Sequence, residues 1–135
     1  MTSNFFSQIL EVITAQDGLK SIIYAKNELS EDCLDHLEYL VQEKNLESLT
    51  LKALKTDNGT ITSLFERIQG SELQTLNLTE LKFFHFSELA EAFLECIESL
   101  SDLKKLNVSN NDMPPIWIAR LVTKISKNEK LKVQL

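Results

Sequence analysis

The sequence predicts a single α/β domain in which about five short parallel strands alternate with helices. The first observation behind this prediction is a segment with apolar residues at positions one, four and six, which occurs four times, with a weaker fifth copy at the C-terminus. The second is its spacing. Position four falls at Ile22, Leu49, Leu76, Leu106 and Val133, at intervals of 27, 27, 30 and 27 residues. The third is that amphipathic helical patterns fill those intervals.

The segments predict strands that begin near residues 19, 46, 73, 103 and 130 of one domain over residues 19–135. Connections of this length favour right-handed crossovers between parallel neighbours. We therefore expect a right-handed β-α superhelix, a solenoid with a curved parallel sheet and the helices on its convex side.

Two helix starts are expected in the first half of the chain. Ser30 is a candidate N-cap before a stripe of leucine and valine residues. Ser63 and Glu66 have capping-box spacing, and Gly70 is the expected C-terminal stop of that second helix.

Two further helix starts and a cap complete the prediction. Ser87 and Glu88 open the third helix, and Pro114 with Pro115 opens the fourth. An amphipathic helix over residues 1–18 is expected to cap the N-terminal end of the core.

Asparagines follow two of the segments, three residues beyond position six, at Asn27 and Asn111. Such side chains can hydrogen-bond backbone groups where the chain turns. The middle copies carry Leu54 and Leu81 instead, so apolar packing is expected to replace the amide there.

Together these motifs resemble leucine-rich-repeat proteins with long, helix-containing repeats of the ribonuclease-inhibitor type. The resemblance covers roughly residues 18–135. It implies recognition of another folded protein through the concave sheet face, with masking of a partner enzyme as one possible mechanism. The size and lysine bias more weakly resemble leucine-rich-repeat effectors that intracellular bacteria such as Legionella deliver into the host cytoplasm, which would make a fellow effector a further candidate partner. An ordinary cytoplasmic repeat protein is the alternative.

Side chains alternate along a strand, so positions three, five and seven point out of the sheet when four and six point into the core. With position eight added, the predicted partner-binding residues are Ser21, Ile23, Lys26, Ser48, Thr50, Lys52, Thr75, Asn77, Thr79, Glu80, Lys105, Asn107, Ser109, Asn110, Lys132 and Gln134. Ile23 is the apolar exception; it is either a binding anchor or, as we favour, partly covered by the N-terminal cap or a neighbouring side chain.

Lysines outnumber acids on this face, whereas the helices are rich in acids. These lysines either attract an acidic surface of a partner protein or simply keep the face soluble, and the sequence leaves both alternatives open. Three aromatic residues outside the face, Phe84, Phe86 and Trp117, are possible secondary contacts, and packing is favoured for Trp117.

The sequence predicts no enzyme and no cofactor. His36 and His85 stand in unrelated contexts without metal-ligand spacing, and three glycines leave no phosphate-binding loop. Cys33 and Cys96 suit buried thiols in helices better than a disulfide. The net charge of -6 argues against nucleic acid and anionic lipid as partners.

These patterns favour a noncatalytic, cytoplasmic protein-binding module with no small-molecule substrate and no membrane association. A substrate-targeting repeat domain of a longer effector or ubiquitin-ligase-like protein is the alternative. Both hypotheses place the working surface on the concave sheet face.

Overall fold

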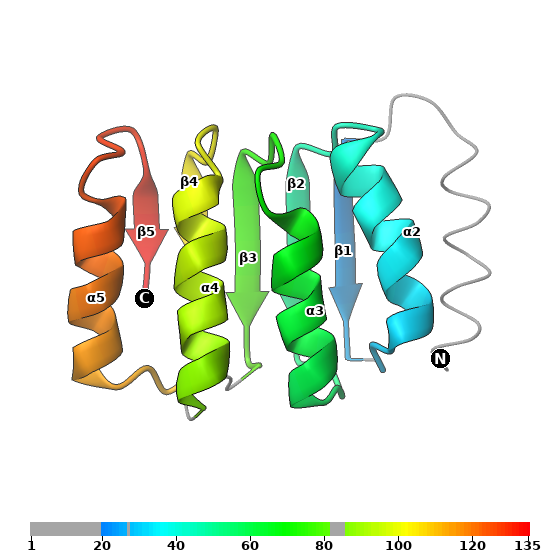
Figure 1. Cartoon of the computed structure of the whole chain (residues 1–135), viewed down its shortest axis with the longest axis horizontal. Helices are drawn as coiled ribbons and strands as arrows, with labels where there is room; N and C mark the ends of the chain where they lie inside the picture. The colour runs from blue at the N-terminus through cyan, green and yellow to red at the C-terminus, as the bar shows by residue number, and fades with distance from the viewer. Residues whose placement is uncertain (1–19, 27, 82–85) are drawn as a thin grey trace.

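The computed structural model describes residues 20–26, 28–81 and 86–135 of the chain. Within those ranges five strands alternate with four helices in one α/β arrangement (Figure 1). The strands are β1 (Ser21–Ala25), β2 (Ser48–Lys52), β3 (Thr75–Thr79), β4 (Lys105–Asn107) and β5 (Lys132–Gln134). The helices are α2 (Glu31–Gln42), α3 (Asn58–Ile68), α4 (Ser87–Ser99) and α5 (Pro115–Ile125).

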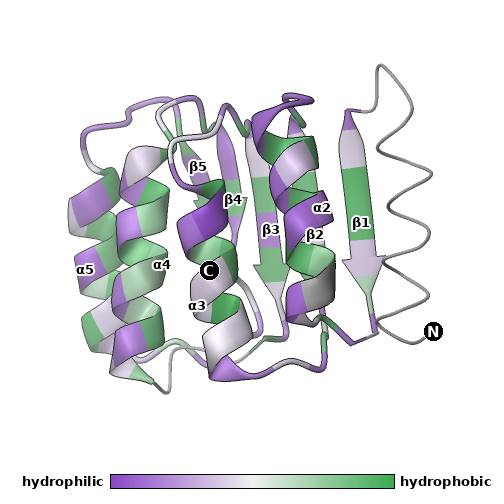
Figure 2. Cartoon of the chain, turned by 45° about the vertical axis from the view of Figure 1, so that its right-hand side comes forward, coloured by the Kyte–Doolittle hydropathy of each residue, from purple (hydrophilic) through white to green (hydrophobic). Residues whose placement is uncertain are grey.

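The five strands form one parallel sheet in sequence order, β1-β2-β3-β4-β5. Its register confirms the spacing prediction, because Ile22 pairs with Leu49, and the row continues through Leu76, Leu106 and Val133. The helices lie side by side on one face of the sheet, in the same order as the strands, in the two views of Figures 1 and 2. Every strand-to-strand connection in this order includes one helix.

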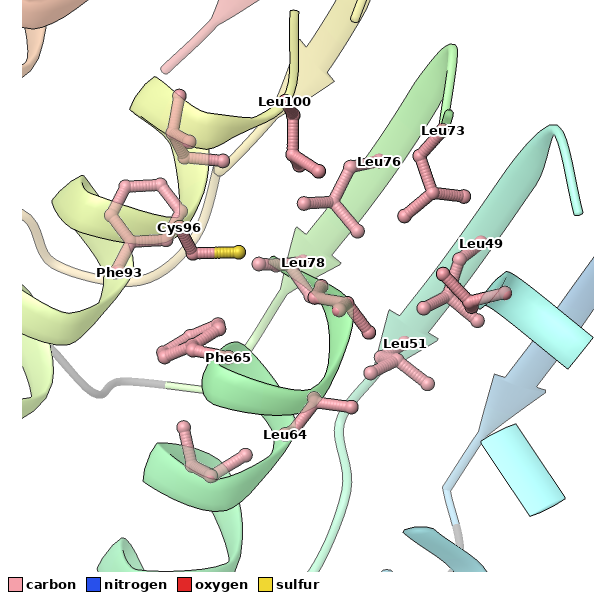
Figure 3. Close-up of a cluster of buried hydrophobic side chains, with 14 of the residues drawn as sticks. Leu49, Leu51, Leu64, Phe65, Leu73, Leu76, Leu78, Phe93, Cys96 and Leu100 are labelled. Carbon is pink, nitrogen blue, oxygen red and sulfur yellow. The ribbon is translucent and has the colours of Figure 1, made fainter. Parts of the chain in front are cut away.

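The core lies between the sheet and the helices and runs along the whole layer. The residues at positions one, four and six of the second, third and fourth segments, which are leucines apart from Val108, are buried with exposures of 1% or less. Figure 3 shows leucines of β2 and β3 pointing towards Phe65 of α3 and Phe93 of α4, whose rings meet edge to face at 5.7 Å between centroids. Apolar burial on this scale is the main stabilising term of the fold.

Asn111 connects two neighbouring strand–helix units, as its position predicts. Its side chain is 1% exposed, and its amide nitrogen donates to the carbonyls of Leu78, 2.6 Å away, and Val108, 2.9 Å away. Its Oδ1 accepts from the backbone N–H of Leu81 at 2.7 Å. One amide therefore satisfies backbone groups on β3, just beyond β3 and just beyond β4.

Apolar packing occupies the equivalent places in the middle units. Leu54 and Leu81 are partly buried and pack against the core, as expected from the missing asparagines. The first asparagine, Asn27, lies outside the described residues, as does the predicted capping helix over residues 1–18.

The backbone turns into the left-handed region at the same place after four strands. Lys26, Ala53, Glu80 and Asn110 have φ angles of 57°, 52°, 57° and 61°. A Cβ atom makes this region costly by about 1–2 kcal/mol for residues other than glycine and, less severely, asparagine. Position eight therefore stores strain in at least three of the units.

The start of α3 differs from the sequence expectation. The helix begins at Asn58, with Asp57 as N-cap accepting a hydrogen bond from the Thr60 amide at 2.7 Å. Ser63 lies inside the helix and accepts from Arg67, so the predicted capping box with Glu66 is wrong. Asp57, six residues before Ser63, takes the N-cap role because its carboxylate accepts from a first-turn amide that has no partner within the helix. The bond holds the pKa of Asp57 below its usual value.

The other helix boundaries agree with the expectations. Ser30 occupies the N-cap position of α2, Ser87 opens α4 and Pro115 opens α5. Gly70, at φ 69°, follows the end of α3. Among the helices of the described ranges, none is both long enough and apolar enough to cross a bilayer.

We predict that Asn111→Ala lowers the free energy of unfolding by about 2–3 kcal/mol, because it leaves buried backbone groups without partners. The measurement is urea denaturation followed by circular dichroism. Asn58→Ala, at an exposed helix position, is the control and should change stability by less than about 0.5 kcal/mol. Equal effects of the two substitutions would contradict the role given to Asn111.

We also predict that Ala53→Gly raises the free energy of unfolding by about 0.5–1 kcal/mol, because glycine relieves the positive φ. The matched control is Ala90→Gly within α4, which should lower it by about 1 kcal/mol or more. Destabilisation by both glycines in the same denaturation assay would show that position eight is not strained.

Candidate functional site

The face of the sheet opposite the helices is the candidate binding surface. On β1 the side chains alternate between buried Ile22 and Tyr24 and exposed Ser21 and Ile23. We call the surface formed by positions three, five and seven the open sheet face. Its members are Ser21, Ile23, Ala25, Ser48, Thr50, Lys52, Thr75, Asn77, Thr79, Lys105, Asn107, Ser109, Lys132 and Gln134.

The structure brings most of the predicted residues together on this face and along its edge at the C-terminal ends of the strands. Exposed side chains are Ser21, Ile23, Lys26, Lys52, Glu80, Lys105, Asn110, Lys132 and Gln134. Partly buried side chains are Ser48, Thr50, Thr75, Asn77, Asn107 and Ser109. The surface is thus mainly polar, with a single large apolar side chain among the described residues.

Two of the sequence expectations for this face need correction. Thr79 is only 8% exposed, so it offers a partner almost no surface. Ile23 is 74% exposed, where partial cover was expected. Its Cβ faces away from the helices, and its register neighbour Thr50 is too short to shield it.

A hydrogen bond and an ion pair occupy part of the N-terminal half of the face. Asn77 donates to the hydroxyl of Thr50 at 2.9 Å, across neighbouring strands. Lys52 lies 3.8 Å from the carboxylate of Glu80. The charge of Lys52 is therefore partly neutralised within the protein.

The C-terminal half contains a hollow of about 420 Å³. We call it the C-terminal hollow; its polar lining comes from Thr75, Asn77, Lys105, Asn107, Lys132 and Gln134. Lys105 and Lys132 are register partners on β4 and β5, so their backbones lie one strand spacing apart. No carboxylate contributes to this lining.

The helix layer carries the opposite electrostatic character. Arg67 of α3 faces three acids of α2, lying 3.7 Å from Glu31 and 3.5 Å from Glu38, with a hydrogen bond to Asp35. The bond to Asp35 raises the pKa of Arg67.

The next ion pairs join α4 to α5. Arg120 pairs with Glu91 through both guanidinium nitrogens, and Lys124 pairs with Glu98 at 2.7 Å. These bonds lower the pKa of both glutamates. The three cations named here thus form ion pairs with acids of a neighbouring helix, whereas Lys105 and Lys132 lie exposed on the open sheet face.

The predicted secondary contacts separate into three cases. Phe84 lies outside the described residues. Phe86 is 51% exposed at the N-cap of α4 and borders a hollow of about 590 Å³ between the starts of α3 and α4. Trp117 is partly buried against the core with Arg120 over its ring at 4.6 Å, which supports packing as its role.

A further hollow, of about 450 Å³, lies outside the residues that the sequence predicted for binding. It lies where α4 and α5 end, with Ile97, Ile125 and Leu131 in its wall. No sequence pattern indicates it, because it arises from the gap between two helix ends and the loop before β5.

Few reactive groups stand near the open sheet face. Burial raises the pKa of the Cys96 thiol to about 12, and Cys33 is buried as well. Over residues 20–26, 28–81 and 86–135, no three side chains of histidine, cysteine, aspartate or glutamate are placed to hold a metal ion. His85 lies outside these ranges.

Comparison with known proteins finds no family model and no curated protein that matches the sequence.

We predict that Lys132→Glu raises the thermal midpoint in low salt by about 2 °C, because it replaces a like-charge neighbour of Lys105 with an opposite charge. Lys127→Glu, away from the sheet, is the matched control and should not give this gain. Adding 1 M NaCl should abolish the difference, since salt screens exposed charges. A gain that persists in high salt would refute the electrostatic explanation.

Proposed function

We propose that this chain is a noncatalytic module of the leucine-rich-repeat type that binds a folded partner protein through its open sheet face. The observation that carries the proposal is that five in-register parallel strands present polar side chains on the face that no described helix covers. Parallel sheets usually have both faces covered. An uncovered, polar and ordered face is therefore suited to recognition.

The leucine-rich-repeat part of the proposal is supported by two features of the core. The row from Ile22 to Val133 stacks equivalent residues across all five strands. Asn111 also ties consecutive turns of the chain together through backbone groups.

A curved superhelix is expected from the sizes of the two layers. Neighbouring strands are about 4.8 Å apart, whereas packed helices need about 8–10 Å. Helices stacked one per strand on a single face therefore bend the sheet away from them. The open sheet face becomes the concave side, which fits a convex protein surface.

Recognition on this surface would require little ordering. The side chains of the face are held on strands whose opposite face is packed into the core, so their backbone positions are fixed before binding. A partner whose own working site is convex would be masked by such a surface, which is a mechanism for inhibition.

The test is affinity purification with the intact chain and a variant of the open sheet face carrying Lys52→Glu, Asn77→Arg and Lys105→Glu. We expect the intact chain to retain a partner in direct binding with purified protein, and this variant to lose it. Circular dichroism establishes that the variant is folded.

The matched control carries Lys127→Glu, Lys130→Glu and Thr123→Arg, which changes the net charge equally at exposed sites outside the face. It should bind as the intact chain does. Retention of the partner by the first variant, or its loss by the control, would place binding elsewhere and overturn the proposal.

A further inference from the structure

The C-terminal hollow holds two lysines whose charges the protein does not neutralise. Within the described residues, neither Lys105 nor Lys132 forms an ion pair, although Lys52 has Glu80 and Lys20 has Glu47, 3.5 Å away. Among the lysines on the strands of the open sheet face, the uncompensated charge therefore lies on β4 and β5; Lys26, beyond the end of β1, also has no ion pair within the described residues.

The position of the two lysines makes this arrangement unfavourable in the free protein. They are register partners at position three, on the same face of neighbouring strands. Like charges placed side by side across strands destabilise a sheet. An anionic group bound between them would remove that repulsion and gain two charge-assisted contacts.

Amides line the hollow directly beside the lysines. Asn77, Asn107 and Gln134 are register partners in the next exposed row. The Oδ1 of Asn107 accepts from the backbone N–H of Ser109 at 3.0 Å, which leaves its NH₂ group as a donor. The hollow thus combines two cations with an amide donor and has no carboxylate in its lining.

We infer that the C-terminal hollow binds carboxylate side chains of an acidic segment of the partner protein. This inference rests on the proposed function and narrows the binding surface. It assigns the preference for acidic side chains to the part of the open sheet face on β3–β5, and Lys52 has no part in that preference. A glutamate or aspartate side chain lies between Lys105 and Lys132, and the amide row contacts the carboxylate or the adjacent peptide groups.

A protein segment is favoured over a nucleic acid by the charge of the whole molecule. The chain has a net charge of -6, and its helices carry many acids. A long phosphate backbone extending beyond the hollow would meet this negative field, whereas a short acidic segment ends within the lysine pair's reach.

The experiment is a titration of the full ¹⁵N-labelled chain with hexaglutamate, acetylated and amidated at its ends, followed by NMR. We expect the backbone signals of Lys105, Asn107, Lys132 and Gln134 to move. The affinity should fall as salt rises.

Paired variants test the assignment. Lys105→Gln with Lys132→Gln should weaken hexaglutamate binding by about tenfold or more, because two charge-assisted contacts are lost. Lys127→Gln with Lys130→Gln removes the same charge at exposed sites outside the face and should weaken hexaglutamate binding by less than about twofold.

Three results would overturn the inference. Hexaglutamate that causes no shifts at the hollow would exclude a carboxylate site there, and equal binding of hexaglutamine would exclude a charge requirement. Tighter binding of a seven-nucleotide oligothymidylate at the same residues would assign the site to phosphate instead.

Failure of the inference is distinguishable from failure of the proposed function. A partner that is lost with the variant of the open sheet face but fully retained by Lys105→Gln with Lys132→Gln refutes the acidic segment alone. A partner that both sets of variants retain refutes the binding face itself.

Discussion

Burial of one side of the sheet against the helices is the constraint on which the rest of the structure depends. A single strand with its helix cannot keep water from its leucines, so each unit needs the next one beside it. The register follows from this requirement, because a slip of one residue would send Leu49 or Leu76 to the solvent side. The same alternation directs Asn77 and Lys105 outward. The packing of the buried face therefore determines which residues lie on the open sheet face.

The sequence predicted the sheet and most of its exposed residues because both depend on periodicity alone. Alternation along a strand and the recurrence of leucine determine which residues share a face, and neither needs tertiary information. The sequence predictions were wrong in two places: the residue that caps α3 and the exposure of Thr79. Asp57 caps α3 because its side chain meets Thr60, whereas Ser63 and Glu66 have the same motif spacing but lie inside the helix. Thr79 is buried although it occupies an outward position, and strand alternation alone gives no indication of this.

The sequence predicted most of the residues of the candidate site but not which of its lysines are paired with an acid. The spacing assigns Lys52 and Lys105 to one face as equals. Only the three-dimensional arrangement shows that Glu80 reaches the first of them and that the second stands next to Lys132. Pairing between side chains depends on rotamers and turn geometry, such as the left-handed backbone of Glu80 itself, and a linear pattern contains neither.

The helix layer is held together by different forces along its length. Ion pairs of Arg67 join α2 to α3, and those of Arg120 and Lys124 join α4 to α5. The seam between α3 and α4 has the ring contact of Phe65 with Phe93 at its centre. Ionic strength therefore acts on the two outer contacts, because salt screens exposed ion pairs, whereas the aromatic contact has no charge for salt to screen. Concentrated salt therefore weakens the two outer contacts of the helix layer by the small amount that exposed ion pairs contribute, and it leaves the middle contact unchanged.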